Sequence, residues 1–375
     1  MKTKLTFSLL AAAAACSLAN AQTAYTTPVG YVTIPIPGTG GVPGVTQKFQ
    51  LANQGLLPPA AVEYTGVAES ITSTYVEDTQ GTWAAGAYVR AGSLGAMISH
   101  LVEITDGPLQ GTMTWVTSST SSQGVGQRLY TSDDISAAGN TASFRVLKCF
   151  TISSLFGTTP TSAALGGAGT ITAADTVKII DPLGTPQTFW FKNSGGSSAT
   201  WGWKIATLPA GVGAADVPHI AIHPNDGLQI TRKRSDDGSL VISGDVKTLN
   251  TKVRVEGSQL TASVFNLIAY HHPAGGLTIG ATGLYTGNAA TGIKGAGTIS
   301  AADLVQIWNP STGSFQQFWY KNSGGSSATW GWKTAGPETI SVPANYVIPS
   351  TAAIMITRKS GNAFTWDIPA VSIAQ

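Results

Sequence analysis

Most of the second half of this chain repeats itself. The thirteen residues KNSGGSSATWGWK run from Lys192 to Lys204 and return unchanged from Lys321 to Lys333. TITAADTVKI precedes the first copy and TISAADLVQI the second, and ITRK follows both. Matching segments lie 126 to 129 positions apart, the size of a whole domain rather than of one solenoid turn. The sequence therefore predicts two related domains in tandem.

Weaker matches set the limits that we expect for these domains. FRVLKCFTISSLFG, which starts at Phe144, matches FNLIAYHHPAGGLTIG, which starts at Phe265. A fainter copy lies near the N-terminus. There GYVTIPIPG resembles TKVRVEG, and the FQLANQGLLPP that follows resembles FNLIAYHHP. We expect an N-terminal β domain over residues 22–143, a first repeat module over 144–264 and a second over 265–375.

Residues 1–21 are typical of a secretory signal peptide. Lys2 and Lys4 precede an apolar run, and Ala19-Asn20-Ala21 places small residues at the cleavage positions. We expect export, with cleavage before Gln22, to the medium, the outer cell surface or the periplasm. A lipoprotein with its lipid on Cys16 is an alternative, although alanines stand where its signal would have leucine.

Composition narrows the class of protein. Without Lys2 and Lys4 the 21 basic residues become 19, equal to the 19 acidic ones, so no basic footprint for nucleic acid is expected. Ten tryptophans and 42% hydrophobic residues argue against disorder. No later run reaches 18 apolar residues, so we expect no transmembrane segment. Cys149, the only cysteine after cleavage, is expected to be a small buried side chain.

Local patterns indicate short strands. Val32, Ile34 and Ile36 alternate with exposed-type residues, and the prolines among them favour a strand at a sheet edge. SLVISGDV, TKVRV, FWFK, WGWK and IMITRK are similar strand candidates bounded by turn residues. Thr172–Asp175 and Ser300–Asp303 resemble capping boxes, which predicts a single short turn before a strand. The expected fold is all-β, with tandem duplicated sandwich-like or barrel-like modules behind an N-terminal β domain.

The exact repeat is expected to form a hairpin. Residues 188–192 and 201–205 are strands, and the adjacent glycines between them favour a chain reversal. Side-chain alternation places Trp201 and Trp203 on one face of the return strand, and Trp190 opposite the phenylalanines beside it.

These aromatic residues have two interpretations. They are the core of each module, or they form an exposed platform that binds a sugar or another chain. The two roles can be divided, with one indole buried and the other exposed. The candidate ligand-binding residues are Lys192, Asn193, Trp201, Trp203 and Lys204 in the first copy, and Lys321, Asn322, Trp330, Trp332 and Lys333 in the second.

No pattern predicts catalysis, a metal or a cofactor. His219 and His223 lie in an extended segment, about 13 Å apart on one face, and the adjacent His271 and His272 point to opposite faces. Acidic pairs such as Asp236-Asp237 and Asp133-Asp134 are expected in turns, and no nucleophile or phosphate-loop motif is present. We expect a protein that is not an enzyme.

Several motifs together resemble an uncharacterised secreted-protein family of verrucomicrobial bacteria. They are TTPVGYVTIPIPG, FQLANQGLLPP, TWAAGAYV, HLVEITDGPLQGTMTWVTSS, TISSLFG, AADTVKI, FWFK with WGWK, ITRK and FNLIAYHHP. The resemblance implies export and a β-rich, internally duplicated architecture, and it supplies no catalytic residues.

These observations favour a secreted or cell-surface structural or adhesive protein without catalytic activity. It would assemble with itself, or bind surface glycans, through the repeated hairpins and the edge strand at 30–37, since exposed edges pair with other chains. A pair of carbohydrate-binding modules is the alternative, and a hydrolase of unrecognised type is a less favoured one.

Overall fold

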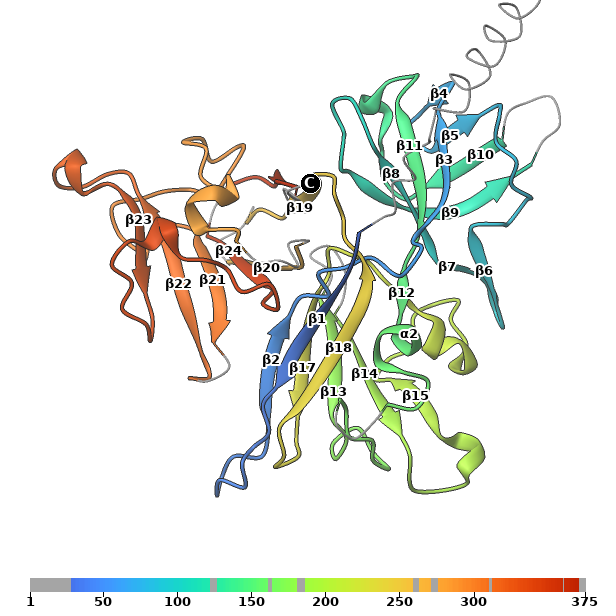
Figure 1. Cartoon of the computed structure of the whole chain (residues 1–375), viewed down its shortest axis with the longest axis horizontal. Coiled ribbons are helices and arrows are strands. Elements are labelled where there is room, and N and C mark those ends of the chain that lie inside the picture. The colour runs from blue at the N-terminus through green and yellow to red at the C-terminus, as the bar shows by residue number, and fades with distance from the viewer. Residues whose placement is uncertain are drawn as a thin grey trace, which may run out of the picture.

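The protein is all-β, as the sequence predicts. A computed structural model describes residues 28–121, 127–160, 164–180, 186–258, 263–270, 276–309, 312–359 and 361–370. All ladders between its named strands are antiparallel. Three lobes are visible in Figure 1. None of the helices in the described part of the chain has the length and apolarity needed to cross a membrane.

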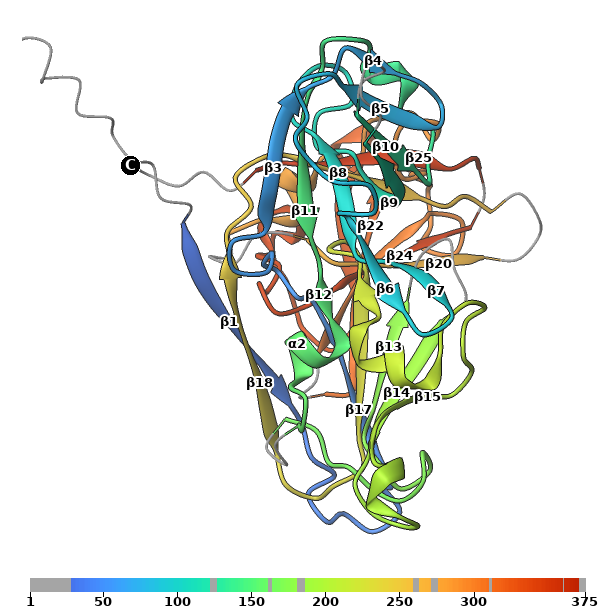
Figure 2. The same ribbon diagram turned by 90° about the vertical axis from the view of Figure 1, so that its right-hand side faces the viewer.

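Module 1 consists of a five-stranded sheet faced by a two-stranded ribbon. The sheet has the order β15 (Gly202–Ile205), β14 (Gln187–Lys192), β13 (Thr176–Ile180), β17 (Gly227–Arg232) and β2 (Lys48–Ala52). The ribbon pairs β1 (Val29–Ile36) with β18 (Gly238–Asp245), which run side by side in Figures 1 and 2.

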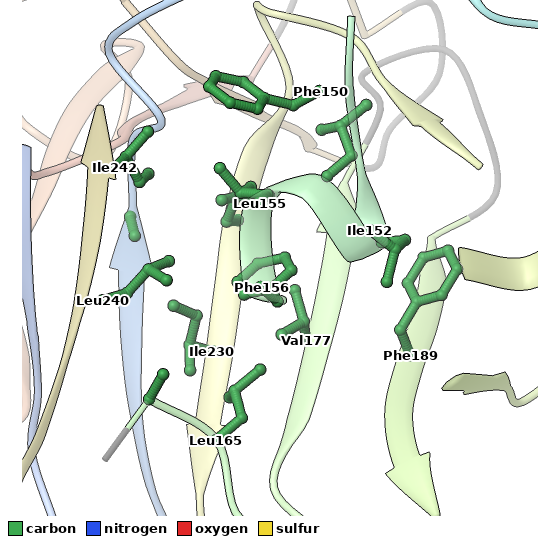
Figure 3. Close-up of a cluster of buried hydrophobic side chains, with 14 of the residues drawn as sticks. Phe150, Ile152, Leu155, Phe156, Leu165, Val177, Phe189, Ile230, Leu240 and Ile242 are labelled. Atoms are coloured by element: carbon green, nitrogen blue, oxygen red, sulfur yellow. The ribbon is translucent and has the colours of Figure 1, made fainter. Parts of the chain in front are cut away.

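The core of module 1 lies between these two layers. The alternating apolar residues of β1 and β18 that the sequence predicts, such as Ile34 and Ile242, are buried against the sheet. The short helix α2 (Ile152–Phe156) adds Leu155 and Phe156 to the same cluster, above Val177 and Ile230 of the sheet (Figure 3). Thr151 caps this helix by accepting a hydrogen bond from the backbone N–H of Ser154.

Module 2 repeats this arrangement strand for strand. Its sheet has the order β20 (Val264–Ile268), β24 (Ile354–Arg358), β21 (Leu304–Asn309), β22 (Ser314–Lys321) and β23 (Gly331–Ala335). Its ribbon pairs β19 (Thr251–Val255) with β25 (Phe364–Ile368). The duplication seen in the sequence is therefore a duplication of one folded unit.

A separate β lobe lies in the chain between β2 and the rest of module 1. Its sheet has the order β3 (Val62–Val67), β11 (Ser143–Lys148), β8 (His100–Ile104), β9 (Met113–Thr120), β10 (Gln127–Thr131), β5 (Tyr75–Asp78) and β4 (Ser70–Ile71). A hairpin of β6 (Val89–Gly92) and β7 (Gly95–Ile98) extends from it. We call this part the inserted lobe.

The remaining elements are short connections. They are β12 (Phe150–Thr151) paired with β16 (Ala221–Ile222), and the 3₁₀ turns η1 (Ser136–Ala138), η2 (Ser198–Thr200), η3 (Ala214–His219), η4 (Ile279–Thr282), η5 (Ser327–Thr329) and η6 (Pro343–Asn345).

The strand pairing differs from the expected domain limits. β1 and β2, expected in an N-terminal domain over 22–143, pair with β18 and β17 of module 1. Phe144, the expected start of the first module, belongs to β11 and pairs with Gly66 and Ile104 of the inserted lobe. The true counterpart of Phe265 is Phe49, which opens the fainter N-terminal match. Module 1 is thus interrupted by the inserted lobe, whereas module 2 is continuous.

The two modules meet through reciprocal backbone contacts. Ala52, at the end of β2, forms a bridge with Ala352 of module 2, and Ile268, at the end of β20, forms the equivalent bridge with Asp226 of module 1. The backbone N–H of Asn53 donates to Thr351 (3.0 Å). Equivalent surfaces of the two modules therefore contact each other, as in a two-fold symmetric dimer.

Apolar side chains close the same junction. Leu51 and its counterpart Leu267 pack in one cluster with Trp308 and Ala353. The ring of Phe49 stacks on Trp308 at 4.1 Å between centroids, and the Trp308 indole N–H donates to the carbonyl of Phe49 (3.0 Å). The modules are joined by packing as well as by the chain.

Buried charges attach the inserted lobe to the chain that leaves module 1. The carboxylate of Glu103 in β8 lies 2.6 Å from the ammonium group of Lys247, and both side chains are fully buried. Arg145 in β11 contacts the same carboxylate. The carboxylate of Asp245, at the end of β18, accepts a hydrogen bond from the backbone N–H of Ala61 (3.0 Å).

Each repeat also holds a buried aspartate that the capping interpretation explained wrongly. Residues 171–174 form the short turn that the sequence predicts before β13, but the aspartate that follows does not cap it. The carboxylate of Asp175 accepts hydrogen bonds from the backbone N–H groups of Gly166 (2.6 Å) and Lys233 (2.8 Å) and lies 3.6 Å from buried Arg232. This carboxylate therefore joins two distant segments instead of capping its own turn.

The second copy repeats these contacts. Asp303 accepts from the backbone N–H groups of Lys294 and Lys359 (both 2.8 Å), and its carboxylate lies 3.1 Å from the guanidinium of Arg358. Both charged side chains are fully buried. The repeated AAD and ITRK segments are thus the two halves of a buried ion pair.

We predict that Asp303→Ala destabilises the protein by about 3–5 kcal/mol, because it leaves the Arg358 charge buried without its carboxylate partner. Asp367→Ala is the control, since the Asp367 side chain is half-exposed beside Lys252 and its loss should cost about 1 kcal/mol or less. Urea denaturation measures both. Equal losses for the two variants would contradict the role assigned to the buried pair.

Candidate functional site

The repeated sequence forms a hairpin with a self-contained tip in each module. Residues 193–201 and 322–330, which we call the tip loops, connect β14 to β15 and β22 to β23. The glycines at 195 and 196 have φ of 75° and 71°, and those at 324 and 325 have 75° and 74°. Positive φ is accessible to glycine without steric cost, so both loops need the Gly-Gly pair to reverse the chain.

Each tip loop is also braced by its own polar groups. The Lys192 ammonium group donates to the hydroxyl of Thr200 (2.9 Å), which itself donates to the carbonyl of Ser197 (2.7 Å). In the second copy Lys321 donates to Thr329 (3.1 Å), and Thr329 donates to the carbonyl of Ser326 (2.7 Å). The repeated loop sequence therefore gives the same conformation twice.

Asn193 and Asn322, expected among the ligand-binding residues, pack against a neighbouring segment. The backbone N–H of Asn193 donates to Ala168 (3.3 Å), and a Cβ at Gly167 would lie 2.8 Å from the Asn193 side chain. The Asn322 amide donates to the hydroxyl of Tyr285 (3.2 Å), and a Cβ at Gly295 would lie 2.8 Å from it. These contacts support the base of each tip loop.

The two tryptophans of each repeat have different environments. Trp201 and Trp330 are 45% and 46% exposed, while Trp203 is only 2% exposed and donates its indole N–H to the carbonyl of Gly157 (2.8 Å). Trp332 is half-buried, with its ring edge-to-face against Tyr320. One indole of each repeat thus belongs to the protein interior and the other to the surface.

This division corrects the expectation that Trp201 and Trp203 share a face. Side chains alternate only along an unbroken strand. Gly202 between them has φ of 125°, and its counterpart Gly331 has 121°, so each return strand begins at the glycine and the preceding indole turns outward. The alternation of side chains in the sequence does not reveal a positive φ at a glycine, so the outward turn of this indole could not be predicted from it.

The outer side of each hairpin carries an aromatic residue that sequence analysis did not select. Trp190 lies on the face opposite buried Phe189 and Phe191, where it pairs directly with Lys204, and Lys192 lies two residues further along the same face. The sequence signal for Trp190 is the FWFK alternation, which places it on the opposite face from the two phenylalanines.

The second copy has the same arrangement, with Trp319 paired to Lys333 and Lys321 two residues beyond Trp319. We call these two sets the hairpin faces: Trp190, Lys192 and Lys204 in module 1, and Trp319, Lys321 and Lys333 in module 2. No aspartate or glutamate occurs in the sequence from 186 to 206 or from 312 to 335. Each face is therefore locally basic although the chain is nearly neutral.

The histidines that the structure describes do not form a metal site. No group of three or more His, Cys, Asp or Glu residues in the described part of the chain could hold a metal ion. His223 packs edge-to-face against Trp115 of the inserted lobe, and its Nδ1 accepts from the backbone N–H of Asn225 (3.1 Å). His271 and His272 lie outside the described residues.

Two cavities bear on the hydrolase alternative. A groove of about 510 Å³ between the inserted lobe and module 1 is lined by Pro58, Lys148, Phe150 and their neighbours, and no carboxylate lines it. A cavity of about 240 Å³ at the junction of the modules has a single carboxylate, Glu338, which accepts a hydrogen bond from Asn309 (2.7 Å). Neither cavity offers the paired carboxylates that glycoside hydrolysis uses.

Comparison with known proteins identifies no relative, since no protein family, curated protein or solved structure matches the chain. The resemblance to secreted verrucomicrobial proteins stays a prediction.

We predict effects of very different size on stability for the two tryptophans of one repeat. Trp203→Ala should cost about 3–5 kcal/mol because it leaves a cavity in the core of module 1. Trp201→Ala should change the free energy of unfolding by about 0.5 kcal/mol or less, because the indole is largely exposed. Urea denaturation of both variants measures the difference, and a large loss for Trp201→Ala would show that the tip indole is structural.

We also predict that His223 makes stability depend on pH. Burial lowers the pKa of His223 to about 4, from an ordinary value near 6.5. Between pH 6.5 and pH 4 the imidazole of His223 is protonated in the unfolded chain but stays neutral in the folded protein. The free energy of unfolding should therefore fall by up to about 3 kcal/mol as pH drops toward 4. His223→Gln should flatten the difference between pH 7 and pH 5, and an unchanged slope would contradict this.

Proposed function

We propose that the protein is a secreted or cell-surface, non-catalytic structural or adhesive protein that holds its partner through the two repeated hairpins. The exposed indoles of Trp201 and Trp330 carry this proposal. Large exposed aromatic side chains cost solubility, and they are enriched where proteins bind. Two of them stand at equivalent positions on loops of identical sequence and conformation.

The braced loops support a binding role. A loop whose conformation is fixed before binding loses little conformational entropy when it meets its partner. The Gly-Gly reversal and the lysine–threonine hydrogen bond fix both tip loops in this way. Core packing alone does not require the serines and glycines of an exposed loop to be identical in two copies.

The position of the hairpins favours bridging. β15 and β23 are the last strands of their sheets, on the side away from β2 and β20 at the junction of the modules. They lie at opposite sides of the molecule in Figure 1. Two equivalent sites at opposite sides of the molecule suit a protein that connects two partners.

The edge strand favours assembly as a second means of attachment. β1 pairs with β18 on one side, and no strand in the described residues pairs with its other edge. Tyr31 is 76% exposed on this strand, and Val241 of β18 is 60% exposed. An exposed apolar edge strand can take up a strand from another chain.

The test is retention on the envelope of the cells that produce the protein. The Trp201→Ala/Trp330→Ala variant should be released to the medium at least roughly tenfold more than the wild type, because an anchoring indole contributes about 2 kcal/mol or more at a binding surface.

Leu208→Ala/Val342→Ala is the matched control, since both side chains are exposed apolar groups outside the tip loops. It should stay on the cells as the wild type does. Retention that is the same for all three proteins, or recovery of the wild type only from soluble periplasm, would contradict the proposal.

A further inference from the structure

The outer surfaces of the two sheets carry one pattern of side chains. In module 1 a cross-strand row runs from Phe49 through Thr231 and Thr176 to Trp190 and Lys204. Residues paired across neighbouring strands share a face, so this row lies on one surface of the sheet.

Module 2 has the same row, from Phe265 through Thr357 and Leu304 to Trp319 and Lys333. Val305 pairs with Phe318, which places Leu304 beside Trp319. The row in module 1 is partly covered, because Phe49 stacks on Trp308 of the other module. In module 2 the equivalent Phe265 is 61% exposed, so this end of the row is open, although Thr357 and Leu304 in its middle are buried.

The charged side chains within each hairpin are all positive. Lys204 stands directly opposite Trp190, with Cβ atoms about 5 Å apart, and Lys192 follows about 7 Å along the strand. Lys178, opposite Thr188 on the neighbouring strand, adds a third ammonium group to the face of module 1. No acidic residue of the hairpins neutralises these groups.

We propose that each hairpin face binds an acidic polysaccharide, a polymer of uronic acid or sulfated sugars. The indole of Trp190 or Trp319 packs on the apolar face of a sugar ring, and the flanking lysines pair with its carboxylate or sulfate groups. This inference rests on the proposed function and names its partner. A neutral sugar would give the lysines of both faces nothing to pair with.

The distribution of charge favours a polysaccharide over a nucleic acid. Nucleic-acid binding depends on an extended basic footprint that contacts many phosphates. Here the basic groups form two small patches on a chain with 21 basic and 19 acidic residues. A sheet surface with one indole and two or three lysines fits a short stretch of an acidic chain.

The arrangement of the modules sets the stoichiometry. Each hairpin lies about 19 Å, or four strand spacings, from the strand at the junction, on opposite sides of it. One polysaccharide chain therefore occupies each face, and one protein connects two chains.

The experiment is calorimetric titration of the full chain with three named probes: polygalacturonate, dextran sulfate and neutral dextran. We expect binding to the two polyanions that weakens steeply as NaCl approaches about 1 M, where charges are screened beyond about 3 Å, and no binding to dextran. Replacing Lys192, Lys204, Lys321 and Lys333 by glutamine should weaken binding at least tenfold. Lys148→Gln/Arg254→Gln removes charge elsewhere and should have no effect.

Lys321→Gln/Lys333→Gln tests the second half of the proposal. This variant should halve the stoichiometry, keep the affinity of the remaining face, and lose the rise in light scattering that cross-linked polygalacturonate gives with the wild type.

Equal binding of dextran, no binding of either polyanion, or unchanged affinity in the four-lysine variant would overturn the inference. The proposed function would stand in each case if Trp201→Ala/Trp330→Ala still released the protein from cells. If that variant stayed on the cells, the proposed function would fail, whatever the titration showed.

Discussion

The pairing of β2 with β17 is the contact on which the rest of the structure depends. The whole inserted lobe separates these strands along the chain, yet Lys48–Ala52 aligns in register with Leu228–Arg232. The pairing completes the sheet of module 1 and brings Ala52 and Asn53 to the junction with module 2. Loop-closure entropy grows slowly with loop length, so a folded insertion need not prevent this return. The inserted lobe adds its own anchor through Glu103 and Lys247.

Reciprocal contact between the modules then determines where the hairpins lie. Because β2 and β20 meet at the junction, β15 and β23 become the outermost strands of the two sheets. The repeated sequence builds each hairpin in two layers. Trp203 and the phenylalanines beside Trp190 fill the core, while Trp190, Trp201 and the lysines remain outside. One hairpin, residues 187–205 in module 1, thus supplies both the stability of the module and the surface that we propose it binds with.

Much of this could be predicted from the sequence, and the failures have physical causes. The period-two alternation of apolar residues predicted the strands, and the internal repeat predicted the duplicated module. Matching of sequence segments could not decide whether Phe144 or Phe49 is the residue of module 1 equivalent to Phe265. The match does not reveal that a whole lobe is inserted between two strands of one sheet. Asp175 resembles a capping residue locally, but its hydrogen-bond donors lie at Gly166 and Lys233. Gly202 ends the alternation through its positive φ, so the outward turn of Trp201 was missed.

Hydroxyl-radical footprinting of the protein, free in solution and attached to the cells that produce it, tests the central claim most directly. We expect Trp201 and Trp330 to be oxidised at similar rates in the free protein, with Trp203 protected, and both tip indoles to become protected on the cell. Oxidation of the two tip indoles at the same rate in both states would contradict the account. So would protection of either one in the free protein.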